Sequence, residues 1–289
     1  DEILKSKARI KTIIVKELKS IAEKYGQPRK SIIIYDDVAR YEEETVEIPD
    51  YPVNLFFTKE GYFKKITPQS LRMSGEQKLK DGDEIIQELE FTNNCDLLFF
   101  TDKCQVYKAK ADDFAQTKAS VLGDYVAAKL GFDEGENAVK MVVTKDYKGM
   151  LLFAFENGKV AKVPLESYAT KTNRKKLTGA YSDKSPLVGL LYMPEDEEVL
   201  FKASSGNMLL VHTGALALKT TRSTQGVAVL KPKKGHRLFS IERYKDGTFT
   251  NPKRYRTGSL PARGALPVND DSKDEQLSLI HISEPTRRV

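Results

Sequence analysis

The chain has 289 residues, of which 40% are apolar and 30% charged, and its net charge is +6 at pH 7. This length and apolar content predict one large or two ordinary globular domains with a hydrophobic core. Every apolar run is far shorter than the about 20 residues of a membrane-spanning helix, and no secretory signal opens the chain. The two cysteines, Cys95 and Cys104, lack metal-ligand spacing and only three histidines are present, so neither a structural disulfide, a zinc site nor a histidine-based catalytic triad is expected.

The first 25 residues have the periodicity of an amphipathic helix. The apolar residues that recur at spacings of three and four are Ile10, Ile14, Leu18, Ile21 and Tyr25. Gly26 and Pro28 supply stop signals, whereas no N-cap is recognised at the start of the chain. We therefore expect residues 1–30 to be the last helix of a domain that is truncated upstream.

An acidic stretch, DDVARYEEETVEIPD, occupies residues 36–50. Its composition is typical of an exposed connection, and it follows the apolar hexamer SIIIYD of residues 31–36. We interpret residues 31–53 as an acidic linker with a first strand, which helps to close a ring of blades or completes a fifth blade.

From Leu55 to about Tyr244, short runs of Phe, Leu, Val and Tyr alternate with turn residues, as in antiparallel β-structure. A similar hairpin signature recurs four times, with the turn residues Gly61, Cys104, Gly158 and Gly206. Their intervals of 43, 54 and 48 residues are typical of propeller blades. We predict a mostly β protein, a β-propeller of about four to six blades over residues 54–268, preceded by one N-terminal α-helix. Asn157-Gly158 predicts a type I′ turn, and Cys104 departs from the glycine pattern.

Lysines stand four positions after the first three turn residues, at Lys65, Lys108 and Lys162, and Leu210 follows the fourth. Because strand side chains alternate between faces, an equal offset places these lysines at equivalent positions on successive blades. We predict that they form a basic track around the rim. The alternative is that lysine protects exposed strand edges against pairing with other strands.

Basic residues also gather in the loops after the hairpins and toward the C-terminal end. Residues 219–263 contain twelve lysines and arginines against two acidic residues, so the rest of the chain sums to −4. A segmental excess of this size attracts polyanions such as nucleic acid. The predicted DNA-binding residues are Lys64, Lys65, Arg72, Lys78, Lys108, Lys162, Arg174, Lys175, Lys219, Arg222, Lys233, Lys234 and Arg237.

Three stretches resemble bacterial type IIA topoisomerase A subunits. IVKELKSIAEKYGQPRKSIII is similar to the helix that leaves the DNA-cleavage core, EGYFKKITPQSLR to the first blade of the C-terminal β-pinwheel, and TTRSTQGVAVLKPKKG to a late-blade motif. The resemblance covers residues 10–265. It implies a β-pinwheel that binds and bends duplex DNA through a basic rim, by charge and spacing rather than by reading base edges.

The same resemblance implies a role in ATP-dependent strand passage. One segment departs from the family's sequence, and this departure bears on the choice between gyrase and topoisomerase IV. The Arg- and Gly-rich box that follows the first blade in gyrase A subunits is replaced here by LRMSGEQKLKDGDEI, which adds Glu76 and Asp81 and lacks the paired arginines. We therefore favour a topoisomerase IV A subunit, which relaxes and decatenates DNA. The alternative is a gyrase A domain that wraps DNA for negative supercoiling. The family's catalytic tyrosine would lie upstream of Asp1, so no tyrosine here is assigned its role.

No GxxxxGK[ST] loop is present, so no cofactor is expected in this chain. The resemblance implies that ATP and Mg²⁺ bind the partner B subunit of an A2B2 heterotetramer, in a cytoplasmic, nucleoid-associated enzyme without membrane contact. A hypothesis of a different class is that the propeller is a protein-interaction platform whose basic rim serves acidic partners.

The polar run NDDSKDEQ begins at residue 269 and predicts a disordered tail over residues 269–289. Within it, LSLIHISEPTR looks like the in-frame translation of a transposase-type sequencing adapter. We interpret residues 277–289 as a fusion artefact of this kind. The alternative is a natural amphipathic tail.

Overall fold

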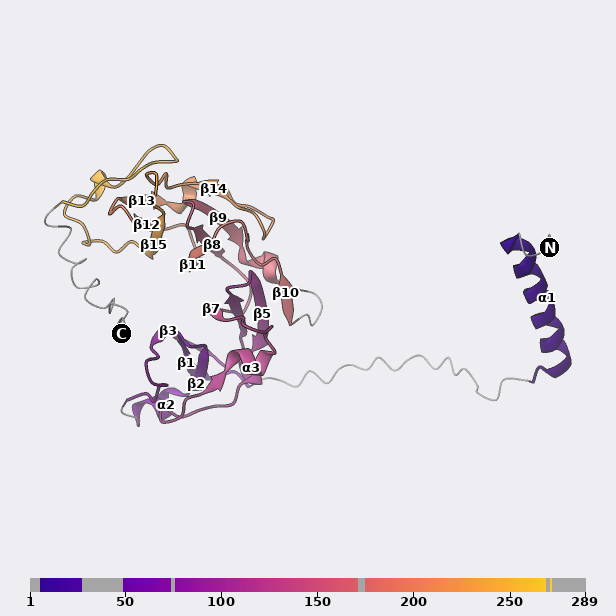
Figure 1. Cartoon of the computed structure of the whole chain (residues 1–289). Helices are drawn as coiled ribbons and strands as arrows, with labels where there is room; N and C mark the ends of the chain where they lie inside the picture. Colours follow the sequence, from indigo (N-terminus) through magenta and orange to yellow (C-terminus); the bar gives the residue numbers. More distant parts are fainter. Residues whose placement is uncertain (1–5, 28–48, 74–75, 171–174, 269–270, 272–289) are drawn as a thin grey trace, which may run out of the picture. The chain divides into compact units, whose positions relative to one another are not determined.

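The computed structural model describes residues 6–27, 49–73, 76–170, 175–268 and 271. The chain divides into two compact units, Asp1–Glu47 and Ile48–Val289. The described part of the first unit is one helix, and that of the second is mostly β-structure (Figure 1). The strand expected at residues 31–36, most of the acidic linker and the tail from residue 272 lie outside the described residues.

The helix α1 (Lys7–Tyr25) forms where the apolar periodicity predicts it. Its first turn corrects the expectation of a missing N-cap, because the Ser6 hydroxyl accepts a hydrogen bond from the Arg9 N–H at 3.5 Å. At the other end the Gly26 N–H donates to the Ala22 carbonyl at 2.8 Å. No described residue of the helix is buried within its own unit.

The described elements of the second unit are short. Its strands are β1 (Pro52–Thr58), β2 (Tyr62–Ile66), β3 (Ile85–Thr92), β4 (Asp96–Thr101), β5 (Gln105–Lys110), β6 (Asp124–Tyr125), β7 (Ala138–Thr144), β8 (Met150–Phe155), β9 (Lys159–Pro164), β10 (Lys176–Thr178), β11 (Leu187–Met193), β12 (Glu198–Ala203), β13 (Met208–His212), β14 (Val227–Ala228) and β15 (Leu238–Arg243). Its helical turns are α2 (Pro68–Arg72), α3 (Val126–Leu130), η1 (Ala111–Asp113), η2 (Leu165–Tyr168), η3 (Thr213–Ala215) and η4 (Pro252–Arg254).

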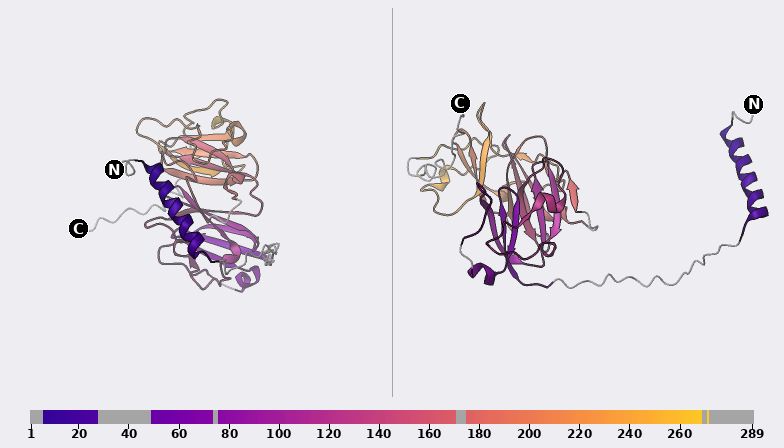
Figure 2. Two further views of the ribbon diagram at one scale, coloured as in Figure 1. Left: turned by 90° about the vertical axis from the view of Figure 1, so that its right-hand side faces the viewer. Right: turned by 60° about the horizontal axis from the view of Figure 1, so that its bottom comes forward.

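The strands form four antiparallel sheets, which we call blades A to D in chain order. Blade A has the strand order β3-β1-β2-β6, blade B β7-β4-β5-β10, blade C β11-β8-β9-β14 and blade D β15-β12-β13. Each blade is built on one of the four predicted hairpins. Figure 2 shows the blades following one another in sequence order, and in Figure 1 the strands β3, β7, β11 and β15 lie on the inner side of their arc. The prediction of a mostly β propeller is confirmed, with four blades in the described residues.

The four hairpin turns share one backbone geometry. Gly61, Cys104, Gly158 and Gly206 all have positive φ, so Cys104 takes the same left-handed conformation as the three glycines. Asn157 has no positive φ, which corrects the type I′ prediction, because that turn needs two left-handed residues. Instead, the N–H groups of the three glycines donate to the carbonyls three residues earlier. This is the geometry of a turn that ends in a single left-handed residue.

The blades interlock, because each of the first three is completed by a strand that comes after the next blade's hairpin. β6 follows the blade B hairpin but pairs with β2 of blade A. In the same way β10 pairs with β5 and β14 pairs with β9. We call the connecting segments 111–124, 165–178 and 213–228 the crossovers. In blade D the segment that follows β15 runs beside β13 instead. Isolated β-bridges join Met208 of β13 to Ala265 and Leu210 of β13 to Arg256.

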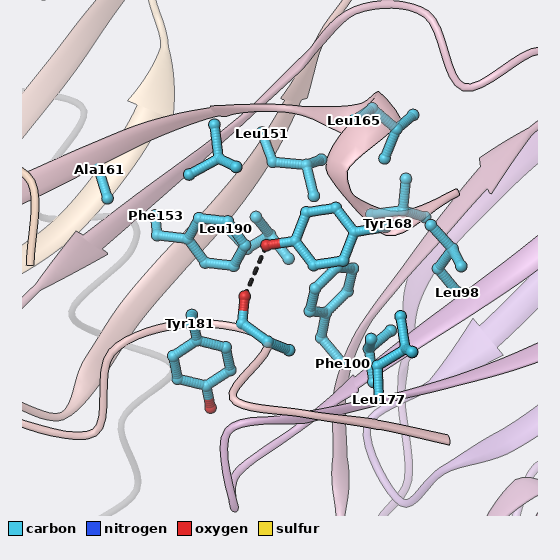
Figure 3. Packing of buried hydrophobic residues seen from close by; sticks show 14 of the residues in the cluster. Leu98, Phe100, Leu151, Phe153, Ala161, Leu165, Tyr168, Leu177, Tyr181 and Leu190 are labelled. Atoms are coloured by element: carbon cyan, nitrogen blue, oxygen red, sulfur yellow. Dashed lines mark hydrogen bonds between the residues drawn. The ribbon is translucent and has the colours of Figure 1, made fainter. Parts of the chain in front are cut away.

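Large apolar side chains fill the space between neighbouring blades. Figure 3 shows the cluster between blades B and C, where Phe100 from β4 and Phe153 from β8 pack edge to face with ring centroids 5.7 Å apart. Tyr168 from the crossover covers Phe100, and its hydroxyl donates to the Ala180 carbonyl at 2.6 Å. Clusters of the same kind join blades A and B and blades C and D.

The innermost strand of every blade carries a β-bulge at its second residue. The register skips one residue at equivalent places in β3, β7, β11 and β15. The bulged residues are Ile86, Val139, Val188 and Phe239. A bulge bends its strand and re-aims side chains, so four apolar side chains repeat along the inner side of the blades.

Candidate nucleic-acid interface

The three lysines four residues after the turns are structurally equivalent, as predicted. The Lys65 carbonyl accepts a hydrogen bond from Thr117, and the Lys162 carbonyl accepts one from Lys219, each at 2.8 Å. The Lys108 N–H donates to the Lys175 carbonyl at 2.7 Å. In each blade this position therefore binds the crossover that arrives from the next blade.

Their side chains point inward, which corrects the prediction of an exposed basic track. Lys65 is 2% exposed. Its Nζ donates to the Asn93 side-chain oxygen and to the Ala111 carbonyl, both at 2.7 Å. Asn93 precedes the first strand of blade B and Ala111 follows that blade's hairpin, so Lys65 ties blade A to blade B.

Lys162 makes the corresponding contacts between blades C and D. It is 5% exposed, and its Nζ lies 2.5 Å from Asp196 Oδ1 and 3.1 Å from the Thr213 carbonyl oxygen. Thr213 also donates its hydroxyl to Asp196 at 2.8 Å. These hydrogen bonds hold the pKa of Asp196 below its ordinary value, with the Lys162 bond as the main cause. The lysine and its carboxylate thus form an ion pair that bridges two blades.

Lys108 occupies the same position between blades B and C and is half-buried. Its Nζ donates to the Thr170 hydroxyl at 3.0 Å and lies 4.9 Å from the centre of the Tyr147 ring. Burial lowers the pKa of Lys108. We call Lys65, Lys108 and Lys162 the latch lysines. In the described residues blade D is the last blade, and there Leu210 packs against Phe249 and Tyr255 instead.

Lys64 is buried as well, although it points to the opposite face of β2. It is 1% exposed, and its Nζ donates to the Lys78 carbonyl at 2.6 Å and to the Ala119 carbonyl at 3.3 Å. The physical reason is that β2 is covered on both faces, by the loop after α2 on one and by the next blade on the other. Lys64, Lys65 and Lys162 therefore lie inside the unit and not on a rim that a phosphate could reach.

The loop after the first hairpin is exposed but poor in net positive charge. Arg72 and Lys78 are exposed. Lys80 forms an ion pair with Glu60 at 3.3 Å. Residues 76–84 contain two lysines against four acidic residues. This loop therefore does not carry the excess of positive charge that would attract a polyanion.

The later loops hold the other predicted cations. Arg174 lies outside the described residues, and Lys175 beside it is exposed. Lys219 is half-buried, and the Arg222 guanidinium lies over the Tyr168 ring at 5.8 Å.

The loop between β14 and β15 carries three more of the predicted cations. Lys233 and Lys234 are exposed there, whereas Arg237 forms an ion pair with Glu156 at 2.9 Å. Further exposed cations of the last blade were not among the predicted residues, although the local charge excess signalled them. They include Lys231, Lys245, Lys253, Arg254 and Arg263.

The net charge differs in sign between the N-terminal and the C-terminal half of the second unit. Residues 50–146, which form blade A and blade B without its last strand β10, contain 13 basic and 17 acidic residues and sum to −4. Residues 147–268, which form blades C and D together with the crossover 165–178 that ends in β10 of blade B, contain 21 basic and nine acidic residues and sum to +12. The excess of positive charge therefore lies on the last two blades, on their loops and on the crossover 165–178.

Other kinds of site find little support in this part of the chain. Among the described residues, no group of three or more His, Cys, Asp or Glu side chains is placed to hold a metal ion. No helix in those same ranges is long and apolar enough to cross a membrane. The described residues of the second unit thus form a four-bladed β-pinwheel, and residues 147–268 carry its excess of positive charge.

Comparison with known proteins finds sequence similarity to DNA gyrase A proteins. No protein-family model matches the chain. The DNA gyrase A protein of Streptomyces coelicolor is 27% identical over 266 residues, which is 86% of this chain and 31% of that protein. The DNA gyrase A protein of Metamycoplasma arthritidis is 25% identical over 290 residues, or 93% of this chain and 32% of that protein. The chain thus spans about a third of the length of the curated relatives it matches.

The solved structures that it resembles show the same fold. The C-terminal domain of DNA topoisomerase IV matches with a TM-score of 0.60 and 24% identity, over 69% of this chain and 63% of that one. A DNA gyrase A C-terminal domain matches with a TM-score of 0.51 and 18% identity, over 74% and 76%. The curated relatives are gyrase A proteins, and the structural neighbours are C-terminal domains of both enzymes.

Proposed function

We propose that this chain is the DNA-binding C-terminal region of a type II topoisomerase A protein, and that blades C and D carry its duplex-binding surface. The observation that supports this most directly is the charge of +12 on the half that contains the exposed lysines of the β14–β15 loop. A field of this kind binds the phosphate backbone without regard to sequence. Residues 50–146 carry a net charge of −4 and would not attract the duplex, which leaves it about half of the perimeter to follow.

A short path of this kind favours a topoisomerase IV-like role over wrapping. The acid-rich segment after the first hairpin and the Lys80–Glu60 ion pair weaken the attraction of blade A for DNA. The parent enzyme would then relax and decatenate DNA. The gyrase alternative is favoured by the curated relatives, which are gyrase A proteins. Circularising DNA on the chain separates the two: little change in linking number is expected, and a large positive shift would favour gyrase.

The proposed enzyme has further parts that this chain does not supply. ATP and Mg²⁺ would bind a partner B subunit in an A2B2 heterotetramer, and the catalytic tyrosine would lie in a cleavage core encoded upstream. We place the enzyme in the cytoplasm, associated with the nucleoid. Co-purification of this chain, joined to a cleavage core, with a B subunit tests the assembly.

The experiment that tests the binding surface is the salt dependence of duplex affinity. The slope of log K against log salt changes by about 0.9 for each phosphate contact. Replacing Lys233 and Lys234 by Ala should flatten the slope by about 1.8 and weaken binding equally for unrelated sequences. The matched control replaces Lys59 and Lys80, two exposed blade A lysines that pair with Glu84 and Glu60. An equal effect of both pairs would contradict a surface confined to blades C and D.

A further inference from the structure

A half-buried lysine on the inner side of the blades differs from the latch lysines in its surroundings. Lys140 on β7 lines two cavities, of about 440 and 320 Å³. Both cavities also contain Leu190 and Leu191 of β11, so they adjoin. The larger is lined further by the bulge residues Val139 and Val188. The inner strands β3, β7, β11 and β15 of the four described blades thus line a hollow with the Lys140 ammonium group in its wall.

The Lys140 ammonium has no hydrogen-bond or ion-pair partner among the residues that the structure describes. Lys65 and Lys162, by contrast, each have two acceptors. Burial lowers the pKa of Lys140, and the positive charge of Arg243 lowers it further. The carboxylate of Asp102 lines the larger cavity and that of Glu90 the smaller one. The pKa of Lys140 is lowered despite these two carboxylates.

An ammonium that is partly removed from water and lacks an acceptor is destabilising. Ionisable groups with perturbed pKa values are concentrated at functional sites. Arg243, which pairs with Glu197 at 3.0 Å, adds a second cation to the wall of the smaller cavity. The rest of that wall is largely apolar and includes Phe91 and Leu191. The wall of the smaller cavity therefore carries two cations against one carboxylate, Glu90, beside a largely apolar lining.

We propose that this hollow is a binding site for a small organic anion, with the anionic group at Lys140 and Arg243 and the apolar body against Phe91, Leu190 and Leu191. Its two volumes lie near the lower end of the range for small-molecule sites, which begins at about 300 Å³. The site lies on the inner strands, whereas the proposed duplex surface lies on the crossovers and loops of blades C and D. It does not depend on the proposed function.

The first test is fluorescence titration of the full chain with 1-anilinonaphthalene-8-sulfonate, an amphipathic organic anion. We expect saturable binding at one site, and at least tenfold weaker binding for Lys140→Met. The matched control, Lys233→Met, removes an exposed lysine and should bind the probe as tightly as the parent chain. Equal affinities of all three chains, or equal losses in both variants, would place the probe elsewhere and overturn the proposal.

Two further measurements separate a binding site from structural and surface effects. Lys140→Met should unfold at the same or a higher urea concentration than the parent chain, because it removes an unpaired charge. A clear loss of stability would mean that the lysine has a structural partner, and would overturn the proposal. Saturating duplex DNA should leave probe affinity unchanged. Displacement of the probe by duplex would assign the anion to the duplex surface instead.

Discussion

Replacing Lys162 by Met tests the role of the latch lysines in holding blades together. The substitution keeps most of the side chain's volume and removes two hydrogen bonds, to Asp196 and to the Thr213 carbonyl. Asp196 keeps its bond from the Thr213 hydroxyl, and the Thr213 carbonyl keeps one from the Leu216 N–H. The damage is therefore confined to the lost charged contact.

The expected loss of unfolding free energy is about 2 kcal/mol. A hydrogen bond to a charged group contributes about 1.5–3 kcal/mol, and a neutral one about 1. Breaking a fully buried ion pair costs about 3–5 kcal/mol, but the Asp196 side chain is 35% exposed, so water compensates part of the loss.

Urea unfolding measures this loss, with tyrosine fluorescence as the signal because the chain has no tryptophan. With m-values of about 1–3 kcal/mol per molar urea, the midpoint should fall by about 1 M. A double-mutant cycle with Asp196→Asn should give a coupling of about 1–2 kcal/mol.

The same variant predicts a pH dependence whose sign follows from the lowered pKa of Asp196. A lowered carboxyl pKa stabilises the folded chain above the ordinary value of 3.8, and this stabilisation is lost as pH falls through the folded-state pKa. The difference between the parent chain and Lys162→Met should therefore narrow below pH 3.8. A difference under about 0.5 kcal/mol, small enough for a surface substitution, would refute the reasoning. So would a flattening of the duplex salt slope by about 0.9.

Three other substitutions and one labelling experiment test the hairpins and the core. Gly158→Ala should cost more stability than Gly206→Ala in urea unfolding. The new Cβ would lie 2.1 Å from the Leu230 carbonyl oxygen at the first position, whereas its closest neighbour at the second is 3.6 Å away. Tyr168→Phe should cost about 1 kcal/mol, since it removes the donor to the Ala180 carbonyl, and an unchanged midpoint would contradict that contact. Burial raises the pKa of Cys95 to about 12, so its alkylation at pH 8 should track unfolding, and fast labelling of the folded chain would contradict its burial.

The repeating hairpins could be predicted because the information that specifies them is local. A left-handed residue between two apolar runs defines a turn, and its recurrence revealed the blades. Cys104 is the exception, because it takes the left-handed conformation at a turn position where glycine is expected. The excess of positive charge toward residues 219–263 was also visible in sequence, and the structure assigned it to blades C and D.

The burial of the lysines was decided by the tertiary structure alone. The sequence determined that Lys65, Lys108 and Lys162 are equivalent, because strand periodicity fixes which side chains share a face. It did not determine whether that face meets water. The crossovers from the next blade cover it, and those contacts join segments about 50 residues apart. The surroundings of Lys140 depend in the same way on four inner strands, β3, β7, β11 and β15, that meet only when the blades pack together.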